Sequence, residues 1–223
     1  MSRSFTYSAL TLRVKHSGES NREAWFLSAE EGIIRATVFG GPKSKLRSLV
    51  APFHEGKLWI YHDPVRDSRK VSDFDVQSWR PGIRELYERA MTADAVAETI
   101  LASHGGGGNW EEAVKLAGSV LDSLDKANAA ACPILAIYFF WHWAQILGIR
   151  PEISENISLA RNTSFRLESG TILFLEKIES LNAASLAEIS AEASSESLGQ
   201  AMALSQAILA NALGRRLSTW EGI

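Results

Sequence analysis

Cations, glycines and aromatic residues gather in the N-terminal third of the sequence, and phosphate binding is the chemistry that such a set performs. The segment FGGPKSKLRS, residues 39–48, holds two glycines, a proline and three cations. Clustered cations neutralise phosphates, small residues let a polyanion approach the backbone, and bases stack on aromatic rings. The candidate phosphate-binding residues are Arg13, Lys15, Arg22, Arg35, Lys43, Lys45 and Arg47. The candidate base-stacking residues are Trp25, Phe26, Phe39 and Trp59.

A second interpretation of the same residues stays open, in which the aromatic rings form a protein core and the cations only keep one face soluble. The formal net charge of the chain is −3, but the charge is unevenly distributed. Residues 1–80 hold 13 Lys and Arg against 9 Asp and Glu, whereas residues 81–223 hold 10 against 17. A basic N-terminal part joined to an acidic C-terminal part suggests a division of labour.

Sequence motifs of catalysis and nucleotide binding are missing. Pro42 interrupts the only segment that resembles a Walker A loop, and the upstream glycine of that motif is absent. The five histidines form no His-x-x-x-His pair, and His142 is interpreted as a hydrogen-bonded core residue. Cys132 is the only cysteine, which excludes an intrachain disulfide and a zinc site built on several cysteines. We therefore predict no enzyme activity, no metal and no cofactor, and a hydrolase using Cys132 with a histidine is the remaining catalytic alternative.

The first eighty residues show the two-residue period of β-strands. Leu10, Leu12 and Val14 lie on one face of the first strand, with polar residues between them. A small sheet of short strands would leave unpaired backbone groups at its edges, and closing the sheet into a barrel removes those edges. The pattern therefore predicts an oligonucleotide-binding (OB) fold, and an SH3-like barrel is the alternative. The pattern predicts about five short strands, drawn from residues 4–16, 22–29, 32–40, 48–53, 57–63 and 69–79.

From Pro81 onward the apolar residues recur at helical spacing. Asn109 and Glu112 form a capping-box-like start for the second helix, and residues 132–149 form an apolar helix that we interpret as buried rather than membrane-spanning. Residues 150–168 are polar and predicted to be irregular, and further helices follow. The predicted architecture is α+β and multidomain, with a five-stranded OB-fold barrel at 1–80 and an all-α helical domain at 81–223.

Five segments of the sequence resemble the RecO family of bacterial recombination mediators, in the order in which that family has them. The segment PKSKLRSLVAPF, residues 42–53, is the most specific of the five. The others are residues 9–41, PGIRELYERA at 81–90, LGIRPEI at 147–153 and LGRRLSTW at 213–220. The resemblance spans nearly the whole chain and implies an N-terminal OB fold followed by a helical domain.

The resemblance also implies functions and partners. A RecO-like protein binds single- and double-stranded DNA, anneals complementary strands and works with RecR, possible further partners being RecF and, indirectly, RecA. It also binds the acidic, hydrophobic C-terminal tail of single-stranded-DNA-binding protein (SSB) and helps to replace SSB by RecA in the bacterial cytoplasm, near the nucleoid. Many members carry a four-cysteine zinc ribbon after the apolar helix. Residues 152–170 of this chain contain no cysteine, so we predict no zinc here.

An acidic, hydrophobic tail requires a hydrophobic groove with a cationic rim, and cations are sparse in the C-terminal part. The candidate partner-binding residues are Arg84, Arg89, Lys115, Arg215 and Arg216. The last two follow a predicted helix and could equally complement its dipole. The rival to a DNA-binding mediator is a non-catalytic interaction adaptor that keeps the OB fold and has weak DNA affinity, because the chain is acidic overall.

Overall fold

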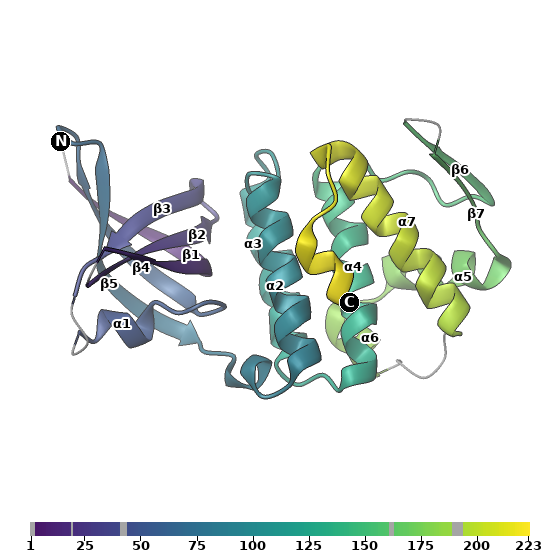
Figure 1. The fold of residues 1–223 in the computed structure, drawn as a ribbon, viewed down its shortest axis with the longest axis horizontal. Coiled ribbons are helices and arrows are strands. Elements are labelled where there is room, and N and C mark those ends of the chain that lie inside the picture. Colours follow the sequence, from purple (N-terminus) through teal and green to yellow (C-terminus); the bar gives the residue numbers. More distant parts are fainter. Residues whose placement is uncertain (1–2, 19, 41–43, 161–162, 189–193) are drawn as a thin grey trace. The chain divides into compact units, whose positions relative to one another are not determined.

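The computed structural model describes residues 3–18, 20–40, 44–160, 163–188 and 194–223 (Figure 1). The chain divides into two compact units. The first, the barrel unit, comprises Met1–Arg80 together with His104–Gly118, and the second, the helical unit, comprises Pro81–Ser103 and Ser119–Ile223.

The barrel unit contains five strands that close on themselves in the order β1-β2-β3-β5-β4. All neighbours pair antiparallel except β3 and β5, which pair parallel at Thr37 and Lys70. This closed five-stranded barrel followed by helices confirms the predicted OB fold and helical domain. The strands are β1 (Ser4–Ser17), β2 (Asn21–Ser28), β3 (Gly32–Val38), β4 (Glu55–Asp63) and β5 (Ser68–Ser78).

Alternation along the strands builds the barrel core. On β2, Ala24 and Phe26 are buried while Trp25 between them stays partly exposed. A bulge between Thr11 and Arg13 bends β1, so that its first half pairs with β4 and its second half with β2. Phe26, which the sequence proposed for base stacking, instead lies inside the barrel with its ring 6.0 Å from that of Phe74. Phe26 is therefore a core residue, and the prediction that it stacks on bases was wrong.

One predicted strand is wrong as well. The segment at 48–53 is not a strand, because Leu46–Leu49 form a short helix, α1, and the chain then turns toward β4. Leu46, Leu49 and Val50 have the i, i+3, i+4 spacing of one helix face, and all three pack against the barrel core. Apolar residues at that spacing cannot all point to one side of a strand, so burial selects the helix.

The helical unit is organised around α4 (Cys132–Ile146), which packs against α2, α6 and α7. Residues Ala129–Ile146 are long and apolar enough to cross a membrane, but 67% of that stretch is buried inside the protein. The apolar helix is therefore the centre of a helical unit. The other helices are the 3-10 helices η1 (Pro81–Arg84), η2 (Ala129–Ala131) and η3 (Ser218–Gly222), and α2 (Tyr87–Ala102), α3 (Trp110–Leu124), α5 (Ser169–Ser180), α6 (Ala183–Glu188) and α7 (Ser195–Leu213).

Hydrogen bonds satisfy the polar atoms of α4. The indole nitrogen of Trp143 donates to Ser103 at 2.9 Å, and that of Trp141 donates to Glu179 at 3.1 Å. His142 lies 3.3 Å from the carbonyl oxygen of Ile178, and burial lowers its pKa. His142 is thus a hydrogen-bonded, half-buried residue of the helical unit.

The segment between α4 and α5 departs from the prediction of irregular structure. Strands β6 (Asn156–Leu159) and β7 (Thr163–Arg166) pair antiparallel into a short hairpin. Ile157 is buried there, and Leu167 just beyond β7 is also buried, so two apolar residues fix the hairpin. Polar neighbours hide this weak alternation in the sequence.

Candidate nucleic-acid interface

Three outward-pointing side chains line up across β1, β2 and β3. Arg13 lies opposite Trp25, and Trp25 lies opposite Arg35. Lys15 and Glu23 form the next pair along β1 and β2. Directly opposed residues in an antiparallel ladder lie about 5 Å apart, so these five residues form one continuous patch. We call it the Trp25 patch.

Two cations flank the ring of Trp25. The Lys15 ammonium lies 5.8 Å from the ring centroid, and the guanidinium carbon of Arg35 lies 5.5 Å from it. Arg35 also donates from Nε to Glu23 at 2.6 Å, and this hydrogen bond with the negative charge of Glu23 raises the pKa of Arg35. A tryptophan ring supplies a stacking surface for a base, and the neighbouring cations supply partners for a phosphate of the same strand.

Arg22 and Arg47 form a second basic cluster, and Arg22 lies on the face of β2 opposite that of Glu23 and Trp25. Arg22 donates from Nη1 to the backbone oxygen of Arg47 at 3.0 Å. Burial, and then the positive charge of Arg47, lowers the pKa of Arg22. A bound anion would reduce the electrostatic repulsion between these two positively charged side chains. Lys45 is exposed just before α1, and Lys43 lies outside the described residues.

Trp59 does not belong to the Trp25 patch. Trp59 lies opposite Thr6 on β1, whereas Trp25 lies opposite Arg13. Seven residues of strand separate those positions, roughly 23 Å at the usual rise. The structure therefore places the two tryptophans on different parts of the barrel. Adjacent bases of one bound nucleic-acid strand could not stack on both of them.

Sequence reasoning missed two cations that lie on aromatic rings. The Lys57 ammonium is 5.3 Å from the ring of Trp59, and the Lys70 ammonium is 5.2 Å from the ring of Phe39. The two-residue spacing of Lys57 and Trp59 on one strand was a visible signal. Lys70 reaches Phe39 only through the pairing of β3 with β5, for which no local spacing is diagnostic.

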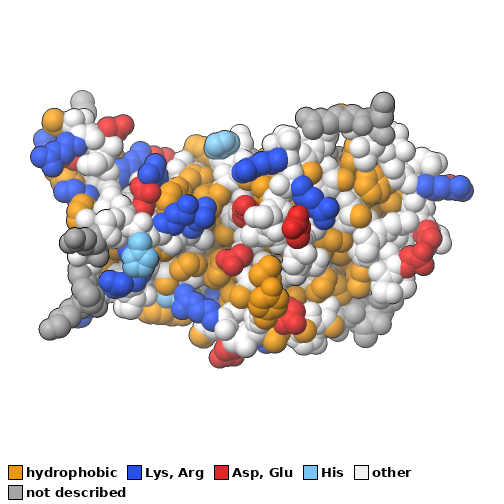
Figure 2. Space-filling model, in the orientation of Figure 1, with side chains coloured by type: hydrophobic (Ala, Val, Ile, Leu, Met, Phe, Trp, Pro, Cys, Tyr) orange, Lys and Arg blue, Asp and Glu red, His pale blue; other side chains and the backbone are white. Residues whose placement is uncertain are grey.

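The surroundings of Trp59 are less suited to a polyanion than the Trp25 patch. Asp73 lies opposite Trp59 and Asp75 opposite Lys57 on the neighbouring strand. Figure 2 shows the same interspersion at larger scale, with Lys and Arg side chains scattered among acidic and hydrophobic ones in that view. The Trp25 patch is the place where predicted cations and a predicted stacking residue come together.

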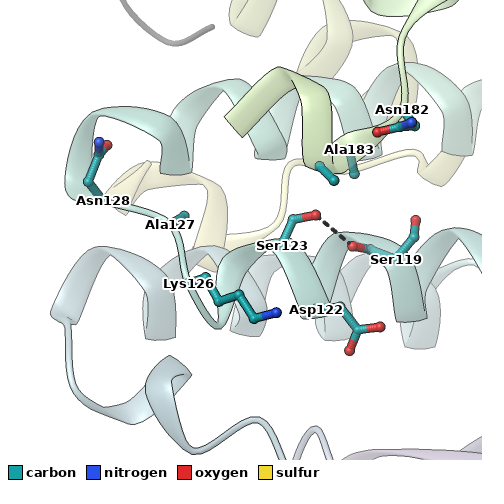
Figure 3. A pocket seen from close by; sticks show the side chains of 9 residues that line it. Ser119, Asp122, Ser123, Lys126, Ala127, Asn128, Asn182 and Ala183 are labelled. Atoms are coloured by element: carbon teal, nitrogen blue, oxygen red, sulfur yellow. Dashed lines mark hydrogen bonds between the residues drawn. The ribbon is translucent and has the colours of Figure 1, made fainter. Parts of the chain in front are cut away.

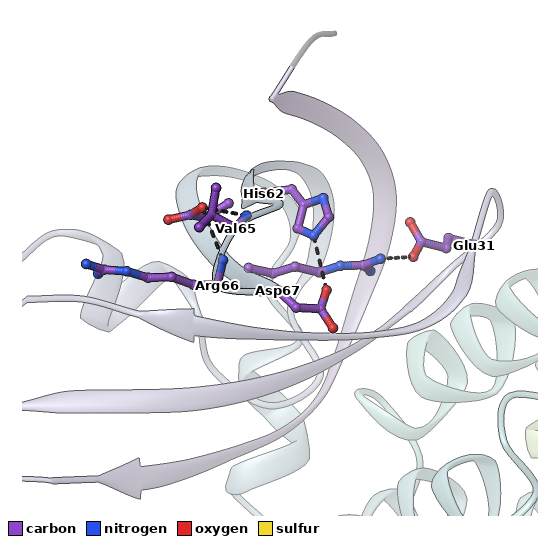
Figure 4. Close-up of polar contacts among 7 residues, drawn as sticks. Glu31, His62, Val65, Arg66 and Asp67 are labelled. Atoms are coloured by element: carbon purple, nitrogen blue, oxygen red, sulfur yellow. Dashed lines mark hydrogen bonds and ion pairs between the residues drawn. The ribbon is translucent and has the colours of Figure 1, made fainter.

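Charges near the β4–β5 turn are paired with one another. Arg69 forms an ion pair with Glu31 at 2.5 Å, and His62 lies 3.4 Å from Asp67 (Figure 4). Tyr7 donates to Glu31 at 2.6 Å, and burial followed by this contact raises the pKa of Tyr7 to about 12. Glu31 thus satisfies two partners, and this end of the barrel is held together by its charges.

Two of the candidate partner-binding cations have internal partners. Arg89 donates from Nε to the carbonyl of Ala127 at 2.6 Å and from Nη1 to that of Gly82 at 2.9 Å. It therefore fixes the loop after α3 to the start of α2. Lys115 forms an i,i+4 ion pair with Glu111 at 2.7 Å, and both side chains are exposed.

The other three candidate cations lie elsewhere. Arg84 is exposed at the end of η1. Arg216 donates to Gln206 at 2.7 Å, and Arg215 is exposed beside it. Arg89 contacts the short helix that ends at Arg84, whereas Arg215 and Arg216 are neighbours just beyond the end of α7.

Arg215 and Arg216 border a groove of about 260 Å³ in the helical unit. Its apolar lining comes from β6 and from one face of α7, so it combines a hydrophobic floor with a cationic end. The lining residues are Leu159, Ala160, Thr163, Ala207, Ala210, Asn211, Gly214, Arg215 and Arg216.

A larger groove of about 690 Å³ lies between the end of α3 and the start of α6 (Figure 3). Lys126 and Asp122 stand on one wall, and Asn182 and Ala183 come from the other. The charges of Lys126 and Asp122 cancel, so the groove has no net positive charge to attract an acidic peptide.

No catalytic site emerges from the described part of the chain. Burial raises the pKa of the Cys132 thiol to about 11, which keeps it protonated at neutral pH and argues against a nucleophile. Among the described residues, no group of three or more His, Cys, Asp and Glu side chains is placed to hold a metal ion.

Comparison with known proteins gives one result for the barrel unit. Residues 1–77 match the family described as Recombination protein O N terminal. That range ends one residue before the end of β5, so it covers nearly all of the five strands and every residue of the Trp25 patch. A search of curated proteins found no match.

Proposed function

We propose that the chain is a DNA repair and recombination protein of the recombination protein O (RecO) family, whose N-terminal part it matches over residues 1–77, and that it binds DNA through the Trp25 patch and anneals complementary strands. In this proposal the protein breaks no bond and needs no nucleotide cofactor. It works with RecR to replace SSB by RecA on gapped DNA.

The arrangement of Arg13, Lys15 and Arg35 around Trp25 is the observation that supports this function best. Complementary strands repel one another until cations lower the potential between their phosphates. Side chains on the outer face of a barrel hold one strand by its backbone and leave base edges accessible to a second strand. Arg22, Lys45 and Arg47 supply further cations on the same unit.

A strand-annealing assay across a salt series tests this function. The variant Arg13→Ala/Lys15→Ala removes two exposed cations of the patch, and Lys115→Ala removes an exposed cation on α3 as a control. We expect single-strand affinity to fall with salt by about 0.7 log units per log unit for each phosphate contact. The double variant should anneal more slowly and show a slope shallower by about 1.4, which is two contacts. Unchanged annealing by this variant would exclude the patch.

For the SSB tail, we propose the groove bordered by Arg215 and Arg216. An acidic, hydrophobic peptide would place its apolar side chains on the Ala207 and Ala210 face of α7 and its carboxylates at the two guanidinium groups. Fluorescence anisotropy with a labelled tail peptide tests this, and Arg215→Glu should weaken binding at least tenfold, whereas Arg166→Glu on the neighbouring strand should not. Equal affinities of the two variants would place the tail elsewhere.

The interaction adaptor remains the second candidate function. Glu23 already neutralises Arg35, and Asp73 and Asp75 lie opposite the tryptophan and lysine of β4. If the protein is such an adaptor, we expect little DNA binding at any salt concentration, while the SSB tail still binds to the groove bordered by Arg215 and Arg216.

A further inference from the structure

Glu23 lies where a phosphate of a bound strand would lie. Its carboxylate accepts a hydrogen bond from Arg35 at 2.6 Å and faces Lys15 across the β1–β2 ladder. These are the two cations that lie on the ring of Trp25. One side-chain carboxylate thus holds a cation of the patch, as a nucleic-acid phosphate would.

The same ion pair keeps Trp25 covered. Arg35 is bonded to Glu23 while its guanidinium stays 5.5 Å from the ring centroid, and Lys15 approaches the same ring at 5.8 Å. A base can stack on Trp25 only after at least one of these cations has moved. The Arg35 side chain is 64% exposed, so water screens the ion pair and an incoming anion can displace it.

We propose that Glu23 is an internal phosphate mimic which closes the Trp25 patch, and that a single strand opens the patch by exchanging a phosphate for Glu23. This inference rests on the proposed DNA-binding function and adds a specificity-determining residue to it. Arg35 then passes from Glu23 to the phosphate, and the freed face of Trp25 accepts the adjoining base. Glu23 therefore lowers affinity and favours polyanions that also supply a base.

Neutralising Glu23 is the direct test. The variant Glu23→Gln keeps the size of the side chain, and Glu111→Gln is the matched control, because it also removes one negative charge from an ion pair on the protein surface. Binding to a fluorescent oligothymidylate of about 16 nucleotides is measured by anisotropy at several salt concentrations. We expect Glu23→Gln to bind about two- to fivefold more tightly than wild type, as the loss of one exposed ion pair implies, and Glu111→Gln to match wild type.

The salt slope separates this exchange from a structural effect. In wild type, the transfer of Arg35 releases the cation condensed on the phosphate, but it leaves the Glu23 carboxylate uncompensated beside the strand, where that carboxylate retains a cation in turn, so the net ion release is small. In Glu23→Gln, Arg35 enters the complex as an additional charge, and the slope should steepen by about 0.7. The gain in affinity should vanish in Glu23→Gln/Arg35→Gln, because it requires Arg35. Trp25→Phe should lose part of the tryptophan quenching that the strand produces.

The outcomes also separate this inference from the function on which it rests. Salt-dependent binding by wild type with equal affinities for Glu23→Gln and Glu111→Gln would overturn the exchange and leave DNA binding standing. A gain that persists without Arg35 would overturn it as well. No binding by wild type or Glu23→Gln at low salt would overturn both proposals.

Discussion

Arg80 shows how one buried cation can organise the end of a barrel. Its side chain is almost fully buried and donates to the carbonyl of Phe53 at 2.8 Å and to Glu55 at 2.5 Å. A third, longer contact of 3.4 Å reaches the carbonyl of Gly118 on α3. Arg80 and Phe53 both have positive φ angles, 48° and 71°, which non-glycine residues adopt only when their surroundings enforce it.

We therefore expect Arg80→Ala to destabilise the protein by about 2–4 kcal/mol, because it leaves the partly buried Glu55 carboxylate and the carbonyl of Phe53 without this donor. Urea denaturation followed by circular dichroism measures the loss. Arg66→Ala removes an exposed arginine from the β4–β5 turn of the same unit and should change stability by less than about 0.5 kcal/mol. A similar small change for both variants would show that the buried hydrogen bonds of Arg80 are dispensable.

At the level of elements, alternation alone was enough to predict the strands of the barrel. Burial on β2 follows the pattern of Ala24, Trp25 and Phe26, because one face of each strand must enter the core. The same reasoning failed for residues 48–53, because a short apolar run before a proline is compatible with a strand or with a helix. The helix forms because Leu46, Leu49 and Val50 pack on the end of the barrel, and that surface exists only after the strands have paired.

The candidate site was only partly predictable for the same reason. Lys15 and Trp25 were selected by residue type, but their proximity depends on the β1–β2 register. Lys70 was missed because it reaches Phe39 across the closure of the barrel. The pairing of Arg35 with Glu23 also required the structure, because nothing in the sequence distinguishes that glutamate from its neighbours.

Strand packing predicts a sharp contrast between two glycines. A Cβ atom at Gly56 on β4 would lie 2.0 Å from the backbone oxygen of Asp75, whereas one at Gly199 on α7 would meet nothing within 4 Å. Gly56→Ala must push β4 away from β5 and should destabilise the protein by more than about 2 kcal/mol. Gly199→Ala should stabilise it by about 0.5–1 kcal/mol, because alanine favours a helix. Thermal denaturation of the two variants should therefore shift in opposite directions, and shifts of the same sign would contradict the strand spacing.

For the whole molecule, charge and packing divide the chain differently. The charge changes sign near Arg80, which is where the period of the sequence also changes. Packing instead includes His104–Gly118 in the barrel unit. A DNA-binding barrel in an otherwise acidic chain would bind polyanions at one place only, since the negative charge of the remainder disfavours extended contact.

The return of the chain to the barrel predicts that residues 1–80 alone are an incomplete folding unit. Trp110 packs on Gly32 so closely that a Cβ atom there would lie 2.7 Å from the indole, and Gly105 lies against Leu27 and Ile33. Trp110 is half-buried, so losing its contacts costs about 2–3 kcal/mol, less than the loss of a fully buried tryptophan, and in a domain of this size each kcal/mol lowers the melting temperature by about 4–8 °C. We expect a fragment of residues 1–80 to melt at least 10 °C below the barrel transition of the intact chain. In the intact chain, Trp110→Ala should reproduce much of that loss, while Trp79→Ala, which removes a half-exposed tryptophan near the end of β5, should not. A fragment as stable as the intact chain would show that the barrel folds independently of residues 104–118.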